Sequence, residues 1–132
     1  MPKIIIASGP VIVEKGKVLL DISGDDKFWK FCGGRPWESE NLPEAAKRRA
    51  REELGINIEI TDSEPFIFHT QKETPEGKMD VILVHYNARR VGEVKPGADI
   101  KEWKWLPLAD LEKNDLAPNV IPTLVHFWYL DK

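Results

Sequence analysis

The chain has 132 residues, of which 42% are hydrophobic and 31% charged, and its formal net charge is -3. A chain of this length fits one domain with its own core, so we assign residues 1–132 to a single domain. The mild acidity argues against a nucleic-acid polymer as the main partner, because proteins that bind such polymers usually carry a basic face.

Segments rich in Ile, Val or aromatic residues alternate with turn residues in the first third of the chain, which predicts a series of strands. The Glu-Lys-Gly-Lys sequence at residues 14–17 is typical of a turn, so the second and third strands should form a hairpin. The last strand delivers the chain to Gly33 and Gly34. We expect these strands at residues 3–8, 10–14, 18–22 and 27–31.

Cys32 is the only cysteine, so no intrachain disulfide can form, and a reducing compartment is the simplest interpretation. No stretch approaches the roughly 18 uninterrupted apolar residues of a membrane span. Residues 1–13 also lack the long apolar core and cleavage pattern of a secretory leader. We therefore expect a cytoplasmic protein without membrane association.

A helix is predicted to begin after Asn41, whose side chain can cap free backbone amides, with Glu44 three positions on to complete a capping box. Pro43 fits the first turn, where a missing N–H does no harm. Gly55 tolerates positive φ and should end the helix.

The second half of the chain predicts more strands than helices. The expected strands are residues 57–61, 65–70, 80–89 and 102–106, with a turn at residues 74–77. A short helix at residues 108–113 and a longer one at residues 120–130 should follow. This order of elements indicates an α/β fold with a mixed sheet flanked by helices.

Two glycines precede the first predicted helix at a notable spacing. From Gly34, five residues lead to Glu40, seven more lead to Arg48, and Glu52, Glu53, Gly55 and Ile56 follow. This stretch resembles the Nudix box, G-x5-E-x7-R-E-U-x-E-E-x-G-U, in which U is a bulky aliphatic residue. Every charged and glycine position matches except Arg49, which stands where the family has glutamate. Ala50 is a milder departure.

The resemblance implies an α/β/α sandwich and a hydrolase of phosphoanhydride bonds that uses Mg²⁺ or Mn²⁺. Glu52, Glu53 and a carbonyl of the glycine turn, assigned here to Gly34, are expected to ligate the metal. Arg48 would orient the carboxylates through a pair with Glu52, and Glu40 would support the site through the loop. The alternative for this helix is an exposed surface laced with pairs of opposite charge.

The residue types fit phosphate chemistry. Glu52 and Glu53 share one arc of the helix with Arg49, where carboxylate oxygens suit a hard cation. Gly33 and Gly34 allow the backbone to approach a diphosphate closely, and the side chain of Arg35 is a candidate for a terminal phosphate, although solvation is its default. The neighbouring arc is apolar and should pack on the sheet: Leu42, Ala46, Ala50 and Leu54.

A guanidinium at residue 49 changes the local charge by two units. Three outcomes are open: fewer metals with phosphate contact from Arg49, rescue by another carboxylate, or a site that binds nucleotide without turnover. Asp99 is the candidate for rescue, because it lies in the loop before the predicted strand at 102–106, where MutT-type members often have a catalytic glutamate. Its alternative is an ordinary loop aspartate.

Asn119 precedes the last predicted helix, where MutT-type members carry an asparagine that reads the base. An amide can pair two groups of a base edge, but this residue is equally well placed as a helix cap. Trp37 in the box loop is the aromatic ring we expect to be exposed. The three histidines lack metal-ligand spacing and are expected in packing or on the surface. The apolar tail, residues 127–130, either closes the core or forms a homodimer contact.

These features favour a small nucleotide as substrate. We expect cleavage of a nucleoside diphosphate linked to a further group, with a nucleoside triphosphate giving monophosphate and pyrophosphate as the preferred reaction. ADP-ribose or a sugar nucleotide is the alternative substrate. A catalytically weakened nucleotide-binding module is the alternative from another functional class, and Arg49 is its best support.

Overall fold

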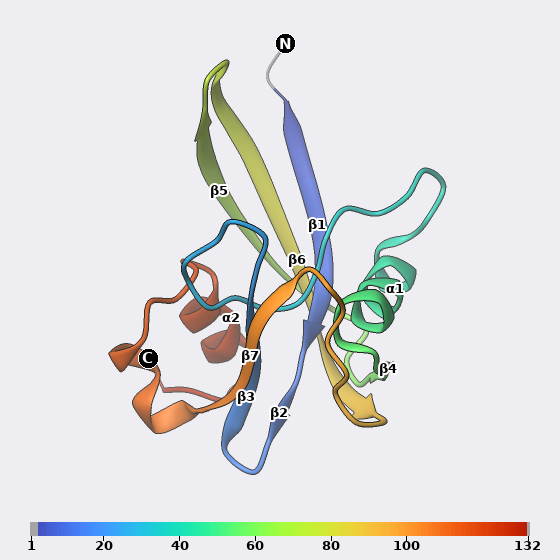
Figure 1. Ribbon diagram of the computed structural model, residues 1–132, viewed down its shortest axis with the longest axis vertical. Helices are drawn as coiled ribbons and strands as arrows, with labels where there is room; N and C mark the ends of the chain where they lie inside the picture. Colours follow the sequence, from blue (N-terminus) through green and yellow to red (C-terminus); the bar gives the residue numbers. More distant parts are fainter. Residues whose placement is uncertain (1–2, 132) are drawn as a thin grey trace.

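The computed structural model describes residues 3–131, and its strands and helices follow one another along the chain as in Figure 1. They are β1 (Ile4–Val11), β2 (Val13–Glu14), β3 (Lys17–Ser23), α1 (Leu42–Leu54), β4 (Asn57–Ile60), β5 (Phe66–Thr74), β6 (Gly77–Val91), β7 (Ile100–Pro107), the 3₁₀ helix η1 (Leu108–Lys113) and α2 (Val120–His126).

Strand β6 organises the larger sheet, which is mixed as predicted. It pairs in parallel with β1, from Ile4 opposite Asp80 to Val11 opposite Asn87, and antiparallel with both β5 and β4. A second, antiparallel sheet has the order β2-β3-β7. The short connection between β1 and β2 carries the chain from one sheet to the other, so the two sheets lie next to each other (Figure 1).

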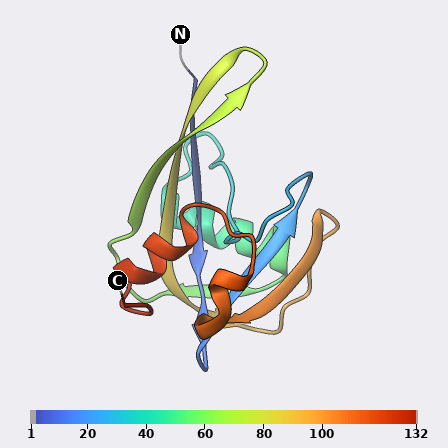
Figure 2. The ribbon, with the colours of Figure 1, turned by 90° about the vertical axis from the view of Figure 1, so that its left-hand side faces the viewer.

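The helices cover opposite sides of the strands, as Figures 1 and 2 both show. On one side, the apolar arc of α1 packs on the larger sheet, with Ala46, Ala50 and Leu54 fully buried against Val84 and Tyr86. On the other side, η1 and α2 complete a second core. Its fully buried members include Val11, Val18, Leu20, Leu111, Val120 and Leu124. The predicted α/β/α arrangement is confirmed.

The bounds of α1 agree with those predicted from its capping residues, Asn41 and Gly55. The N–H of Glu44 donates to Asn41 Oδ1 at 2.9 Å, so Asn41 is the cap. Gly55 has a φ of 67° and ends the helix. A β-carbon at Gly55 would stand 2.5 Å from the carbonyl oxygen of Lys95, so the close approach of that loop also favours glycine.

The predicted strand at residues 27–31 was wrong. This segment is a loop held by two isolated bridges, one between Lys30 and Asp21 and one between Trp29 and Leu116. Adjacent residues thus pair with different segments, and no continuous ladder can form. The loop therefore joins β3 to the chain that precedes α2.

The short helix predicted at residues 108–113 is present as a 3₁₀ helix with the same bounds. The last predicted helix was too long, because α2 ends at His126 rather than at residue 130. Trp128 adopts a φ of 67° and reverses the chain, which lets the Tyr129 hydroxyl donate to Asn87 Oδ1 at 2.8 Å. Phe127, Tyr129 and Leu130 pack against the second core, while Trp128 is 92% exposed.

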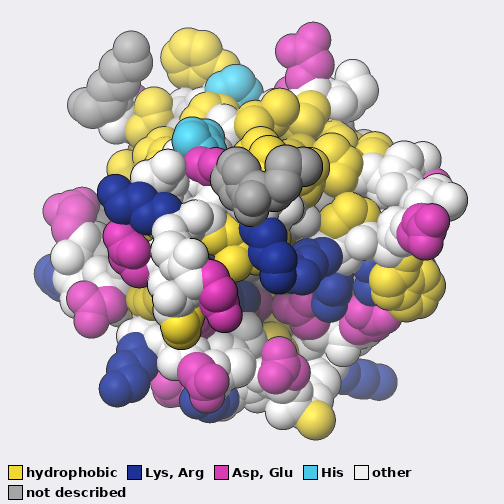
Figure 3. Space-filling model, turned by 90° about the horizontal axis from the view of Figure 1, so that it is seen from above, with side chains coloured by type: hydrophobic (Ala, Val, Ile, Leu, Met, Phe, Trp, Pro, Cys, Tyr) yellow, Lys and Arg dark blue, Asp and Glu magenta, His cyan; other side chains and the backbone are white. Residues whose placement is uncertain are grey.

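Strands β5 and β6 extend further than predicted, to the turn at residues 74–77 that the sequence indicated. Seen from above, the surface shows basic and acidic side chains side by side, and hydrophobic side chains gathered in its upper part (Figure 3). Ile4 on β1 and Ile67 on β5 are each 60% exposed. Within residues 3–131, no helix has the length and apolar character needed to cross a membrane.

Candidate active site

The glycine turn is fixed against the first strand. Ser8 and Gly34 exchange two backbone hydrogen bonds, Ser8 N–H to Gly34 O at 2.9 Å and Gly34 N–H to Ser8 O at 3.1 Å. The Ser8 hydroxyl also donates to the carbonyl of Leu42 at 2.7 Å, which ties the start of α1 to the same strand. The Gly34 carbonyl, our predicted metal ligand, therefore already accepts a hydrogen bond from β1.

Arg48 holds the loop between the glycines and α1. Its Nε and one terminal nitrogen each donate to a different oxygen of Glu40 at 2.9 Å, its other terminal nitrogen donates to Glu52 at 2.9 Å, and the Arg35 carbonyl accepts at 3.0 Å. The guanidinium lies 3.9 Å from the ring centre of Trp37. The hydrogen bond from Arg48 is the main reason why the pKa of Glu40 falls to about 2.

The two glutamates of α1 have different surroundings. The Glu52 side chain is 44% exposed, whereas that of Glu53 is 12% exposed. Burial raises the pKa of Glu53 to about 6; the charge of Asp21 adds to this rise, and the charges of Lys30 and Arg49 oppose it. Glu53 can therefore exchange a proton near neutral pH.

Arg49 lies across the glycine turn, between Gly34 and the two glutamates. A β-carbon built on Gly34 would stand 2.5 Å from Cζ and Nε of Arg49, so a larger residue at position 34 would require the Arg49 side chain to shift from this position. The guanidinium is 3.8 Å from the Glu52 carboxylate and 3.9 Å from that of Glu53, and it donates to the Arg35 carbonyl at 3.1 Å. A fixed cation thus stands among the predicted metal ligands.

A third carboxylate, Asp21 of β3, lies beside Glu53. Asp21, Cys32 and Glu53 each offer one potential metal-ligand atom, and these three atoms lie within 4.8 Å of one another. Asp21 is fully buried, and among the described residues its Oδ2 has no hydrogen-bond partner. We missed Asp21 in the sequence, although a carboxylate within the apolar run of residues 18–22 was a signal, since buried charge is costly.

Asp99 is exposed in the loop before β7. Its carbonyl accepts a hydrogen bond from Gly24 N–H at 3.2 Å, and its charge contributes to the raised pKa of Asp21, which burial chiefly causes. The loop thus brings Asp99 to the side of the cluster formed by Asp21 and Glu53.

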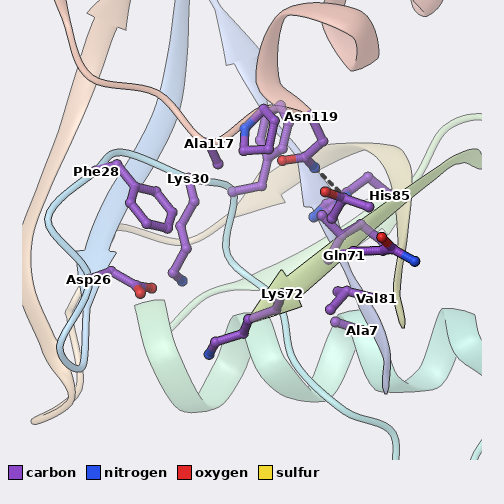
Figure 4. A pocket seen from close by; sticks show the side chains of 15 residues that line it. Ala7, Asp26, Phe28, Lys30, Gln71, Lys72, Val81, His85, Ala117 and Asn119 are labelled. Atoms are coloured by element: carbon purple, nitrogen blue, oxygen red, sulfur yellow. Dashed lines mark hydrogen bonds between the residues drawn. The ribbon is translucent and has the colours of Figure 1, made fainter. Parts of the chain in front are cut away.

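Figure 4 shows a pocket of about 450 Å³, and one of its lining residues is Lys30, which forms an ion pair with Asp21. Gly33 and Lys30 line it near the box, and His85 and Asn119 line it near α2. Phe28, Phe31, Val81, Leu83, Ala117 and Pro118 supply apolar walls. The remaining polar lining comes from Asp26, Thr70, Gln71 and Lys72. A pocket with apolar walls and polar side chains that can orient a ligand is typical of a small-molecule site.

Asn119 directs its amide toward His85 rather than capping α2. Burial lowers the pKa of His85 to about 3, so the ring is neutral, and its Nδ1 lies 3.5 Å from Asn119 Nδ2 as an acceptor. The helix makes no side-chain cap bond with Asn119. Of the three histidines, His85 therefore packs in the interior as expected, but it also contributes to the pocket.

The other predicted residues lie at the edges of this site. The side chain of Arg35 is exposed, and its carbonyl serves both box arginines. Trp37 is 62% exposed, as predicted. His69 pairs with Asp80 at 2.8 Å, and His126 packs on Phe66; neither histidine lines the pocket.

Comparison with known proteins agrees with this geometry. The family model described as NUDIX domain matches residues 4–127. The chain is 30% identical over 121 residues to nucleoside triphosphatase NudI of Escherichia coli O139:H28 (strain E24377A / ETEC), covering 81% of this chain and 84% of that protein.

Solved structures show the same fold. The solution structure of the E. coli ORF135 protein has a TM-score of 0.71 at 28% identity and covers 96% of this chain and 90% of its own. A NUDIX hydrolase from Nitrosomonas europaea has a TM-score of 0.80 at 17% identity, with coverages of 96% and 89%. The chain belongs to the Nudix family and is a hydrolase.

Proposed function

We propose that this hydrolase adds water across the α–β phosphoanhydride of a nucleoside triphosphate, which gives a nucleoside monophosphate and pyrophosphate. The observation that carries the proposal is the pocket, because its lining includes Asn119, Gly33 of the glycine turn and Lys30, the ion-pair partner of Asp21. A base held near Asn119 would place its phosphates toward the box. The name of the relative NudI, a nucleoside triphosphatase, supports the same substrate class.

The donor atoms fit a divalent cation of the Mg²⁺ or Mn²⁺ type, since these ions prefer carboxylate and carbonyl oxygen. Glu52, Glu53 and Gly34 would hold it, and the Asp21 carboxylate lies next to Glu53 with one oxygen free of partners among residues 3–131. Such an ion neutralises phosphate oxygens and lowers the pKa of a bound water. Arg48 keeps Glu52 in place through its hydrogen bond.

Arg49 supplies a second, permanent positive charge. Its position between Gly34 and the glutamates is where a further cation would otherwise be bound, so the site takes fewer metal ions than a box with glutamate at residue 49. Its guanidinium can donate to phosphate oxygens in a geometry that suits them. Glu53, with a pKa near 6, and Asp99 are the candidates for accepting the proton of water.

Around this site we propose a single cytoplasmic domain at residues 1–132. A homodimer through exposed Trp128 stays a prediction, and so do the substrate alternatives ADP-ribose and sugar nucleotides. The competing function is a nucleotide-binding module without turnover, and the position of Arg49 among the carboxylates is the observation in its favour.

Product analysis tests the proposal. The protein is incubated with nucleoside triphosphates, dinucleotides, ADP-ribose and sugar nucleotides, with Mg²⁺ or Mn²⁺ and in parallel with chelator, and products are separated by chromatography. We expect a nucleoside monophosphate and pyrophosphate that disappear in chelator. Turnover of ADP-ribose or a sugar nucleotide alone would replace the proposed substrate, and binding without turnover by folded protein would establish the module.

A further inference from the structure

Lys30 lies between the box carboxylates and the end of the pocket that contains Asn119. Its side chain is 21% exposed and lines the pocket together with Gly33 (Figure 4). Its charge acts on groups at both ends, because it lowers the pKa of Glu53 against the effect of burial and adds to the burial that lowers the pKa of His85. Lys30 therefore stands at the junction of the two halves of the site.

Asp21 fixes the position of this ammonium group. The backbones of Asp21 and Lys30 exchange two hydrogen bonds of 2.9 Å, and Lys30 Nζ donates to Asp21 Oδ1 at 3.3 Å. Asp21 is completely buried, and Lys30 is the basic residue in contact with it within residues 3–131. A buried carboxylate with one unbonded oxygen adds little stability, so holding Lys30 in place is the better explanation for its presence.

The ammonium has hydrogens to spare. A lysine ammonium carries three donors, and Asp21 accepts one. The remaining donors adjoin the pocket wall between Gly33 and the apolar residues that would surround a base. An anionic ligand group suits a lysine ammonium at this point, and in a nucleotide whose base lies near Asn119 the anionic group that follows the sugar is the 5′-phosphate.

We propose that Lys30 is a substrate-binding residue that contacts the phosphate attached to the nucleoside, and that Asp21 is the residue that positions it. This inference rests on the proposed function, because it assumes a nucleotide in the pocket. In this arrangement Lys30 binds the phosphate attached to the nucleoside, and the metal ion and Arg49 bind the outer phosphates.

Binding of products in chelator tests the role of Lys30 without turnover. The probes are the nucleoside 5′-monophosphates and the matching nucleosides, measured by calorimetry or, for weak ligands, by ligand-observed NMR. Lys30→Met should weaken the monophosphate about tenfold or more, as loss of a charge-assisted hydrogen bond does, and should change nucleoside affinity less than twofold. Lys30→Arg keeps the charge and should retain most of the affinity.

Two further variants separate binding from folding. Lys30→Met leaves Asp21 buried without its cation, so the double variant with Asp21→Asn removes both charges and should show the same loss. Asp21→Asn alone should lower monophosphate affinity by a smaller factor without affecting the nucleoside. The matched control is Lys27→Met, because Lys27 belongs to the same loop but is exposed and does not line the pocket; monophosphate affinity should stay within about threefold.

Equal weakening of nucleoside and monophosphate, or an unchanged monophosphate affinity in Lys30→Met and in the double variant, would overturn the assignment. So would failure of the wild-type protein to bind any monophosphate. Failure of the proposed function has a different signature, namely no chelator-sensitive release of monophosphate from any triphosphate. A protein that binds monophosphates through Lys30 but does not turn over would lose the proposed function and keep this inference.

Discussion

The guanidinium of Arg49 lies against the backbone of Gly34, so closely that a β-carbon on the glycine would come within 2.5 Å of Cζ and Nε. The same side chain stands 3.8 Å from Glu52 and 3.9 Å from Glu53. Arg49, the residue that departs from the family pattern, therefore lies within the site. Predictions about metal and charge depend on this contact.

Replacing Arg49 should separate its two effects. Arg49→Gln removes the fixed charge from the phosphate site and should lower kcat/KM by roughly 10- to 100-fold, in the range of a lost transition-state donor. Arg49→Glu adds a carboxylate and should allow one more Mn²⁺ per chain, counted by electron paramagnetic resonance. An Arg49→Glu variant that gains activity from an inactive wild type would instead show that Arg49 disables the site.

Glu53 should make the metal-free protein less stable as pH rises. Its pKa is 4.5 in the unfolded chain and about 6 in the fold, so the folded state binds more protons between these values and stability falls across them. The difference of about 1.5 units corresponds to about 2 kcal/mol above pH 6. Glu53→Gln should remove this loss, measured by urea unfolding in chelator at pH 4.5 and 7.5.

The control variant for this unfolding experiment is Glu52→Gln, because the Glu52 side chain is 44% exposed. A stability difference between wild type and Glu53→Gln that does not change with pH would contradict the raised pKa. With metal present, Glu53→Gln should also lower kcat by roughly 100-fold or more, since it removes a ligand or a base.

Arg48 should be irreplaceable by lysine. A lysine cannot donate to both oxygens of Glu40 and still reach Glu52 and the Arg35 carbonyl, so Arg48→Lys should reduce the free energy of unfolding by about 3 kcal/mol. The matched control is Arg51→Lys, because Arg51 is exposed on the same helix. Chemical denaturation measures both, and equal effects of the two variants would argue against this role.

Glu40 should contribute to acid resistance through the same contact. Its pKa is lowered from 4.5 to about 2, mainly by the hydrogen bond from Arg48, so its stabilising effect is complete above pH 4.5 and is lost as pH falls toward 2. Glu40→Gln should therefore begin acid unfolding at a higher pH than wild type. Circular dichroism during acid titration gives the midpoint; an unchanged midpoint would argue against the Arg48 contact.

Asp99 should matter for catalysis if it supplies the carboxylate that residue 49 lacks. Asp99→Asn should then lower kcat by about tenfold or more at saturating Mg²⁺, without a change in folding. Asp25→Asn is the control, since Asp25 is an exposed aspartate of the neighbouring loop. Wild-type activity in Asp99→Asn would return Asp99 to the role of an ordinary loop residue.

Asn119 should govern the choice of base. Asn119→Ala should reduce the ratio of kcat/KM between the best and worst of the four nucleoside triphosphates by about tenfold or more, as loss of an amide contact to a base does. Asn57→Ala, at an exposed position on β4, should leave the ratio unchanged. A ratio that survives Asn119→Ala would mean that other pocket residues read the base.

Much of the box could be predicted from sequence because its contacts are local. Asn41, Gly55 and the apolar arc of α1 depend on neighbours within the helix or one turn beyond it. The predicted pair of Arg48 with Glu52, one helical turn apart, is present at 2.9 Å, whereas the two hydrogen bonds from Arg48 to Glu40 were not predicted. The order of strands followed from composition in the same way.

The pocket could not be predicted, because distant segments build it. Lys30 reaches the site from a loop whose backbone pairs with Asp21 on one side and, through Trp29, with Leu116 on the other. His85 and Asn119 are 34 residues apart and meet only when β6 and the start of α2 come together. The hydrophobic pattern of a segment does not indicate pairings between distant residues, which is why the sequence predicts a strand at residues 27–31 where the structure has a loop.

The bridge between Ser8 and Gly34 makes the glycine turn dependent on β1, and β1 in turn aligns with residues 80–87 of β6. A nascent chain that has emerged only as far as residue 56 already contains every residue of the box. It still lacks β6, which aligns β1, and β1 in turn holds Gly34, the first residue of the box. Hydrolytic competence must therefore arise only after the chain has been synthesised and released from the ribosome beyond residue 87.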